Sequence, residues 1–302
     1  MIERLAVIGV GLIGGSLARA LKSAETVGEV IGCGRSRENL ELALELGVID
    51  GFSCDPAEAV RDADMVFIAV PLGAIARVFE RIRGQLSEAA VVTDGGSVKG
   101  SVVADAKRVF GEIPPWLVPG HPIAGTEHNG VASSFPELYR HRRVILTPLA
   151  QTDADARARV RAMWEQTGAE VTEMSVAHHD EVLAATSHLP HMLAFGLVDA
   201  LSRMRSNDEI FRYAAGGFRD FTRIASSSPE MWRDICLANA DALSTMLARF
   251  GAEMGKLSET IRREDGETLL RIFERARAAR DRYVDGVGAE GDGSSRADKT
   301  PD

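Results

Sequence analysis

The chain has 302 residues, which is long enough for two domains with separate hydrophobic cores. Its hydrophobic content of 45% and charged content of 26% are those of an ordinary globular protein. The formal net charge of -9 argues against a nucleic acid partner, because binding to phosphates requires a basic patch. A small anionic ligand held by a few local arginines is still compatible with this charge.

The three cysteines, Cys33, Cys54 and Cys236, are widely spaced and form no CxxC pattern. They indicate neither a disulfide framework nor a zinc site, and we expect no metal. The segment Met1 to Val10 enters a strand pattern at once, which leaves no room for a signal peptide. No apolar run approaches the roughly 18–20 residues that a membrane span needs. We therefore expect a cytoplasmic protein without a membrane partner.

Short apolar runs alternate with helical periodicity from Leu5 to about Leu149, which predicts a doubly wound α/β domain over residues 1–150. The predicted strands are Leu5 to Ile8, Val30 to Gly32, Met65 to Val70, Ala90 to Thr93, Trp116 to Val118 and Val144 to Thr147. The predicted helices are Leu12 to Lys22, Arg37 to Leu46, Ala74 to Gln85 and Val98 to Phe110.

The segment 151–175 is predicted to link this domain to a second one. It contains one helix, Asp153 to Thr167, and a short strand, Glu170 to Met174, that can close the sheet.

Residues 176–284 have the periodicity of amphipathic helices, interrupted at Pro190, Gly216-Gly217 and Pro229. These helices carry more apolar surface than one small helical layer can bury, so we expect a helical second domain that forms a homodimer. The tail 285–302 is rich in Gly, Asp and Ser and is predicted to be disordered.

A GxGxxG motif, Gly9, Gly11 and Gly14, lies directly after the first predicted strand, and Leu12 and Ile13 begin the helix that follows. The tight turn, the close approach of the backbone to a pyrophosphate and the packing of helix on strand each need a residue without a side chain. At the first strand-to-helix turn of an alternating domain, this motif predicts a dinucleotide site.

The position that reads the 2′ group of the nucleotide lies about 20 residues further on, at the end of the second strand. The chain has no acidic residue there to hold ribose hydroxyls, but it has Arg35, Ser36 and Arg37. These side chains can hold a 2′-phosphate, so we expect NADP rather than NAD. The alternative is that Arg37 lies on the solvated face of the next helix.

Further segments cluster polar residues among small or apolar ones. His121 follows the apolar run Trp116 to Val118, a junction at which open α/β sheets place their chemistry, and its imidazole is a natural general base. The segments are DGGSVKG (Asp94 to Gly100), GHPIAGTE (Gly120 to Glu127), SHLPH (Ser187 to His191) and GGFRDFTRIA (Gly216 to Ala225).

Together, and in this order, these segments resemble the prephenate and arogenate dehydrogenase family of tyrosine biosynthesis, over nearly the whole chain from Ile2 to about Tyr283. The resemblance implies a Rossmann domain, a helical dimerisation domain and an active site between them. It also implies oxidative decarboxylation of an anionic cyclohexadienol, with hydride transfer to a nicotinamide. Aromatisation supplies the driving force. The sequence leaves open whether the substrate is prephenate or arogenate.

The resemblance assigns roles to individual residues. His121 matches the catalytic histidine that accepts the proton of the ring hydroxyl as hydride leaves. Ser97 matches a serine near both that histidine and the nicotinamide. Arg223 matches the arginine that holds a substrate carboxylate, a task that suits its planar fork.

Other matches leave two interpretations open. His191 is expected to contact the substrate, although it can instead be a cap or core histidine. Glu127 and Trp232 match positions that line or gate the pocket. Glu127 can also pair with the ammonium group of arogenate, and Trp232 can simply pack between helices.

The remaining polar residues near these motifs carry weaker expectations. His188 is ambiguous and is left out of the site, and His178 and His179 are expected to be solvated or to cap a helix. Lys99, Arg219 and Arg233 either add positive potential to the pocket or lie on an ordinary surface.

Two rival functions predict different sequence features. A β-hydroxyacid dehydrogenase would carry a catalytic lysine on a long interdomain helix, but no lysine occurs between Val176 and Lys256. A nicotinamide-sensing protein without catalytic activity would show a damaged set of residues, but His121, Ser97 and Arg223 are all present.

Overall fold

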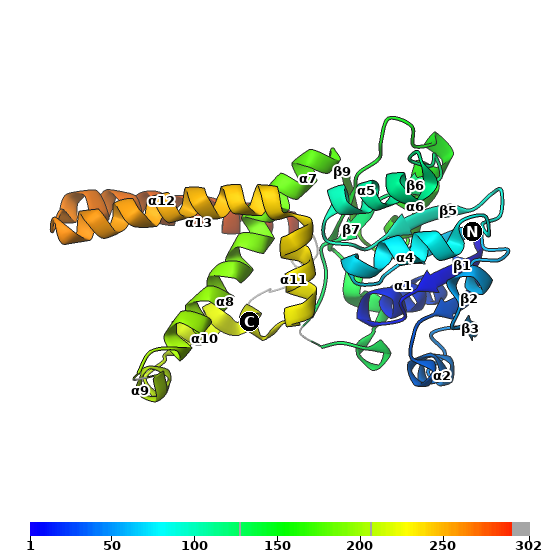
Figure 1. Ribbon diagram of the computed structural model, residues 1–302, viewed down its shortest axis with the longest axis horizontal. Coiled ribbons are helices and arrows are strands. Elements are labelled where there is room, and N and C mark those ends of the chain that lie inside the picture. Colours follow the sequence, from blue (N-terminus) through cyan, green and yellow to red (C-terminus); the bar gives the residue numbers. More distant parts are fainter. Residues whose placement is uncertain (127, 206, 292–302) are drawn as a thin grey trace, which may run out of the picture. The chain divides into compact units, whose positions relative to one another are not determined.

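The computed structural model describes residues 1–126, 128–205 and 207–291 (Figure 1). These residues form two compact units, Met1–Leu243 and the chain from Ser244 onward. Within the described part of the chain, no helix is both long and apolar enough to cross a membrane.

The first unit contains a parallel sheet of six strands in the order β3-β2-β1-β4-β5-β6. The order reverses between β1 and β4, which is the topological switch point at which open α/β sheets bind ligands. The strands are β1 (Ile2–Ile8), β2 (Val27–Cys33), β3 (Gly51–Ser53), β4 (Met65–Ile68), β5 (Val91–Asp94) and β6 (Leu117–Val118).

Helices cover both faces of this sheet, as the alternation of strand and helix predicts (Figure 1). On one face Phe67 packs edge-to-face on Trp164, and on the other Phe79 lies in the core with Ile8 and Val102. The helices of the first 170 residues are α1 (Leu12–Ser23), α2 (Arg37–Glu45), α3 (Pro56–Ala59), α4 (Leu72–Ile82), α5 (Lys99–Phe110), η1 (Val131–Ser133), η2 (Pro136–Tyr139) and α6 (Ala154–Glu165).

A second sheet contains three strands, β7 (Gly120–Pro122), β8 (Arg143–Leu146) and β9 (Glu170–Glu173), in that order. The strand β8 runs antiparallel to β7 and parallel to β9. The prediction that Val144 to Thr147 and Glu170 to Met174 extend the main sheet was therefore wrong. Strand periodicity fixes which face of a strand is buried but not which strand is its neighbour.

The rest of the first unit is helical. Pro190 does not interrupt its helix, contrary to the prediction, because a π-helical turn, η3 (Ala184–His188), joins α7 to α8 and brings the proline to the first turn of α8. The elements are α7 (Val176–Leu183), α8 (Leu189–Ser202), α9 (Asn207–Arg212), α10 (Gly216–Thr222), η4 (Arg223–Ser226) and α11 (Pro229–Ala238).

Two long helices, α12 (Ala240–Arg262) and α13 (Gly266–Gly291), end the described chain. The pKa of Glu253 on α12 is lowered mainly by Lys256 and also by Arg275 on α13, so the two helices run close together. Helix α13 continues past Asp285 into the segment predicted to be disordered, since a formed helix adds residues at little cost even where propensity is low. Residues 292–302 of the predicted tail lie outside the described residues.

Candidate active site

The strand β7 places His121 beside the end of the main sheet. His121 pairs with Ile145 of β8, and the amide of Gly120 donates to Asp94 at the end of β5 over 3.2 Å. The small residues of the segment GHPIAGTE favour a loop at His121, and this expectation is wrong because His121 lies on β7. A three-residue strand that begins with glycine and ends with proline has too short a pattern to show strand periodicity.

A completely buried ion pair contacts the backbone of this strand. The ammonium group of Lys99 contacts the carboxylate of Asp94 and donates to the carbonyl oxygen of Gly120 over 2.5 Å. Asp94 also accepts from the amide of Gly96 over 2.7 Å. The surface alternative for Lys99 was wrong, because a lysine at the first turn of α5 points here into the sheet end, where a carboxylate neutralises it.

The His121 ring lies within hydrogen-bonding distance of a second histidine. Its Nδ1 is 2.9 Å from Nε2 of His179, and Nδ1 of His179 is 2.7 Å from Oδ1 of Asp180. His179 is fully buried where α7 packs on α5, so the prediction of a solvated or capping residue was wrong. The sequence signal was the pair His179-Asp180, but only the packing of α7 shows which neighbour the imidazole meets.

The electrostatic surroundings keep His121 neutral. Burial lowers the pKa of its imidazole well below the ordinary value of 6.5, and the positive charge of Lys99 acts in the same direction. Among the described residues, only Nδ1 of this ring makes a hydrogen bond. Nε2 is therefore the ring nitrogen left for a ligand.

A second group of predicted residues gathers around Trp232. The His191 ring stacks on this indole with 3.7 Å between ring centroids, and Nδ1 of His191 donates to the carbonyl of Ser187 over 2.9 Å. Burial lowers the pKa of His191 in spite of that bond, and the charge of Arg223 lowers it further. Arg223 therefore lies close to His191, although its own side chain is exposed.

Trp232 also belongs to a small core. It is 6% exposed and packs with Val98, directly before Lys99, and with Ile235. The structure therefore contains the packing alternative for Trp232, and the indole also stacks on His191. His188, which was left out of the site, lies edge-on to the same indole, and burial lowers its pKa to about 4.

The other predicted residues lie at the edges of these groups or outside the residues that the structure describes. Ser97 is half-buried in the turn between β5 and α5. Glu127 lies outside the described residues. Arg219 is exposed, and Arg233 pairs with Asp234 on the surface, in agreement with the surface alternative for both.

The glycine-rich turn after β1 fits a dinucleotide. Gly9 has a φ of +104°, and a Cβ there would lie 2.2 Å from the carbonyl oxygen of Ala69. A Cβ on Gly14 would lie 2.2 Å from the carbonyl oxygen of Gly9, whereas one on Gly11 would meet nothing within 4 Å. The open space at Gly11 lies at the N-terminus of α1, where backbone N–H groups favour a phosphate. The helix continues directly with Leu12, which is buried, and Ile13, which packs against the core.

The residues predicted to hold a 2′-phosphate lie at the end of β2. Arg35 is exposed in the turn, and the Ser36 hydroxyl caps α2 by accepting from the amide of Asn39 over 3.2 Å. Arg37 forms a surface pair with Glu41 over 2.9 Å and lies over the ring of Phe52. The solvated-face alternative for Arg37 is therefore what this structure contains.

The comparisons with known proteins identify the family. Residues 17–173 match the family model for the prephenate dehydrogenase nucleotide-binding domain, and residues 175–275 match that for the prephenate dehydrogenase dimerization domain. The chain belongs to the prephenate dehydrogenase family. This membership agrees with the resemblance carried by the sequence motifs and sets aside a β-hydroxyacid dehydrogenase.

Relatives in the prephenate dehydrogenase family cover nearly all of the chain. A cyclohexadienyl dehydrogenase of Zymomonas mobilis is 41% identical over 92% of this chain and 95% of its own length. A prephenate dehydrogenase of Bacillus subtilis is 37% identical over 93% of this chain and 76% of its own. The crystal structure of prephenate dehydrogenase from Aquifex aeolicus with hydroxyphenyl propionate and NAD+ is similar, with a TM-score of 0.88 and 36% identity over 94% of this chain and 99% of that one. The chain is thus an oxidoreductase that uses a pyridine nucleotide.

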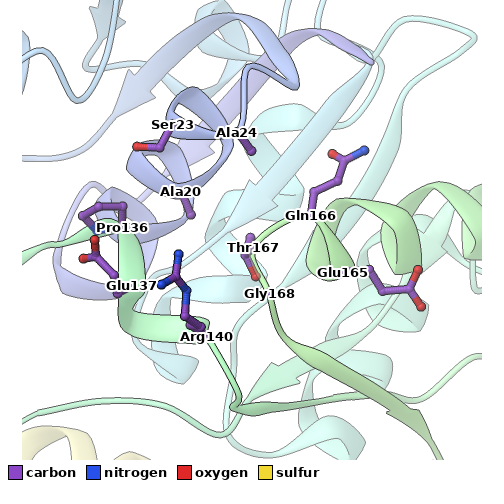
Figure 2. Close-up of a pocket in the computed structure, with 10 residues that line it drawn as sticks. All are labelled: Ala20, Ser23, Ala24, Pro136, Glu137, Arg140, Glu165, Gln166, Thr167 and Gly168. Atoms are coloured by element: carbon purple, nitrogen blue, oxygen red, sulfur yellow. The ribbon is translucent and has the colours of Figure 1, made fainter. Parts of the chain in front are cut away.

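One surface hollow lies apart from the prephenate dehydrogenase motifs. Figure 2 shows it between α1, η2 and the turn after α6, with the Arg140 guanidinium directed into it, and its volume is about 350 Å³. Among the described residues, none predicted for the site lines it. Nor do the described residues contain a group of three or more His, Cys, Asp or Glu side chains that could hold a metal ion.

Proposed function

We propose that the protein oxidatively decarboxylates prephenate, arogenate or both, and transfers hydride to a nicotinamide nucleotide in tyrosine biosynthesis. The products are 4-hydroxyphenylpyruvate and tyrosine, respectively. The observation that carries this proposal is the buried, neutral imidazole of His121, whose Nδ1 is engaged and whose Nε2 is open, in a chain of this family.

His121 accepts the proton of the substrate hydroxyl and later donates it back. The bound nucleotide supplies the hydride acceptor. As hydride leaves the carbinol carbon, the C–O bond gains carbonyl character and the hydroxyl becomes acidic, so a base of low pKa such as His121 is sufficient. When the bond to the ring carboxylate breaks, its electron pair enters the ring, CO2 departs, and His121 returns the proton to the oxygen of the new phenol.

Positive and polar groups near Trp232 suit an anionic substrate. Arg223 lies close enough to His191 for its charge to lower the pKa of that ring, and a guanidinium binds carboxylate through two parallel hydrogen bonds. The Nδ1 of His191 donates to a backbone carbonyl, which leaves Nε2 of the neutral ring as an acceptor for a substrate hydroxyl. Ser97, in the turn before α5, is assigned to orient His121 and the nicotinamide.

The nucleotide preference is assigned to NADP. The turn after β2 offers Arg35 and Ser36 and has no acidic side chain for ribose hydroxyls. Arg37 can join them if it leaves Glu41, because an exposed pair of this kind holds its partners weakly. An Arg35→Ala variant should lose catalytic efficiency with NADP and keep it with NAD. An equal loss with both nucleotides would show that Arg35 does not bind a 2′-phosphate.

The decisive experiment crosses both substrates with both nucleotides and follows the absorbance of the reduced nucleotide. We expect turnover with at least one pair, and a loss of about 10²-fold or more in His121→Asn with nucleotide binding retained. Turnover in none of the four would favour a nicotinamide-sensing protein. An arogenate preference would support the pairing of Glu127 with an ammonium group, and a prephenate preference would support a gating role.

The assembly proposed is a cytoplasmic homodimer. We assign residues 1–150 to the nucleotide, 151–175 to a linker and 176–284 to the substrate and to dimerisation, in line with a match to a dimerization domain over 175–275. The helices α12 and α13 expose large apolar side chains that a second copy can cover. Such side chains include Met254, Ile261, Leu270 and Phe273.

A further inference from the structure

The histidine that touches His121 has no role in the reaction proposed above. His179 is fully buried, and its imidazole lies between the His121 ring and the carboxylate of Asp180. We propose that His179 and Asp180 are positioning residues that hold His121 in the tautomer able to accept the substrate proton. This proposal rests on the proposed function, because it concerns how the same base is prepared.

The hydrogen-bond directions follow from the chemistry of the carboxylate. An ionised Asp180 can only accept, so Nδ1 of His179 must carry a hydrogen over the 2.7 Å to Oδ1. In a neutral His179 ring, Nε2 is then an acceptor, and His121 must donate to it from Nδ1 over 2.9 Å. The lone pair of His121 is thereby fixed at Nε2, the nitrogen left free for the substrate.

Asp180 is itself held in place from two elements. Its carboxylate oxygens accept from the backbone amides of Lys99 and Gly100, each over 2.8 Å, at the start of α5. Its backbone carbonyl accepts from the side-chain amide of Asn239, after α11, over 2.9 Å. Burial acts to raise the pKa of Asp180, but the hydrogen bond with His179 and those from the two backbone amides favour the charged carboxylate and lower the pKa overall.

The surroundings of the two rings keep His121 neutral until it accepts the substrate proton. Burial and the positive Lys99 ammonium on α5 make a second proton on His121 unfavourable while no substrate proton is transferred. Once His121 has accepted the substrate proton, the negative Asp180 at the far end of the chain of hydrogen bonds stabilises the new charge.

The first readout is spectroscopic and needs no substrate. In protein labelled with ¹⁵N-histidine, long-range ¹H–¹⁵N spectra distinguish the two tautomers, and a His121→Asn variant identifies the His121 signals. We expect Nδ1–H for His121 in the wild type and in His179→Gln, because the amide oxygen of glutamine replaces the Nε2 acceptor. In His179→Phe the Nδ1–H form should give way to Nε2–H or to a mixture.

The second readout is kinetic. His179→Phe should lower kcat by about 10–100-fold with little change in KM, the usual scale for losing a residue that orients a functional ligand. His179→Gln should recover most of that loss. The matched control is His178→Phe, because His178 is exposed on the same helix. This variant should keep the wild-type kcat and the wild-type His121 signals. If His179→Phe does not fold, His179→Asn asks the same question, because its amide is too short to reach His121.

The outcomes separate the two proposals. An unchanged Nδ1–H signal of His121 in His179→Phe, or in His179→Asn, would overturn the positioning role, as would an Nε2–H signal in the wild type. Equal losses of kcat in the Gln and Phe variants, with unchanged tautomers, would reduce His179 to a packing residue and also overturn it. If the tautomer changes as predicted in His179→Phe but the wild type turns over neither substrate, the positioning role is supported and the proposed function is refuted.

Discussion

Replacing Lys99 with methionine tests whether the buried ion pair supports the site. The ammonium group is fully buried and has two partners, the carboxylate of Asp94 and the carbonyl oxygen of Gly120. Methionine is similar in length but leaves both partners without their cation. The Asp94 carboxylate keeps the amides of Gly96 and Gly120, over 2.7 and 3.2 Å, but remains a buried charge.

The expected cost follows from the uncompensated charge. Removing one partner of a buried pair typically lowers the free energy of unfolding by about 3–5 kcal/mol. For a unit of this size, such a change lowers the melting temperature by about 10 °C. Adding Asp94→Asn to Lys99→Met removes the charge that was left behind, so the double variant should be more stable than Lys99→Met alone.

The assay is thermal unfolding followed by circular dichroism, with the melting temperature of each variant compared at one protein concentration. Lys22→Met is the matched control, because Lys22 pairs with Asp50 over 2.6 Å at the solvent-accessible surface and should cost below about 1 kcal/mol. If Lys99→Met melts like this control, or if the double variant is less stable than Lys99→Met, the reasoning from a buried charge is wrong.

Three further predictions concern acid stability, the nucleotide and the substrate. Burial lowers the pKa of His188 from 6.5 to about 4, so between these values the unfolded chain binds a proton that the folded chain excludes. The free energy of unfolding should fall by about 3 kcal/mol as the pH falls through this window. The urea midpoint plotted against pH should have a shallower slope for His188→Asn than for the wild type. Gly14→Ala should abolish nucleotide binding or folding, whereas Gly11→Ala should fold and bind nucleotide more weakly in a fluorescence titration. Arg223→Ala should raise KM roughly 30-fold, or about 2 kcal/mol, with kcat less affected and with Arg219→Ala as an unchanged control.

Features set by local sequence were predicted correctly. The glycines of GxGxxG and the apolar runs on either side of them identified the first strand, the tight turn after it and the helix that follows, because each depends on residues close along the chain. The grouping of His191 with Trp232 and Arg223 followed from the resemblance to a family, since nothing in their spacing alone brings them together.

Features set by packing between distant segments were missed. His179 and Lys99 look like surface residues of amphipathic helices, and their partners are 58 residues away at His121 and 21 residues away at Gly120. A charge at a helix start is ordinarily solvated, and only a carboxylate brought in by the sheet makes burial favourable. Strand β7 escaped notice because its pairing with β8 is a tertiary contact.

The π-helical turn η3 sets the angle about the helix axis between the histidine before it, His179, and the histidine after it, His191. The amide of Leu189 donates to the carbonyl of Ala184, five residues earlier, so the helix holds one residue more than an α-helical turn would. If the same residues were wound as a regular α-helix, everything that follows would be rotated by about 100° about the helix axis. His191 would then leave the face of Trp232 while His179 stayed beside His121. A homologue that keeps its second histidine in the same place without a π-helical turn would therefore have to be one residue shorter here.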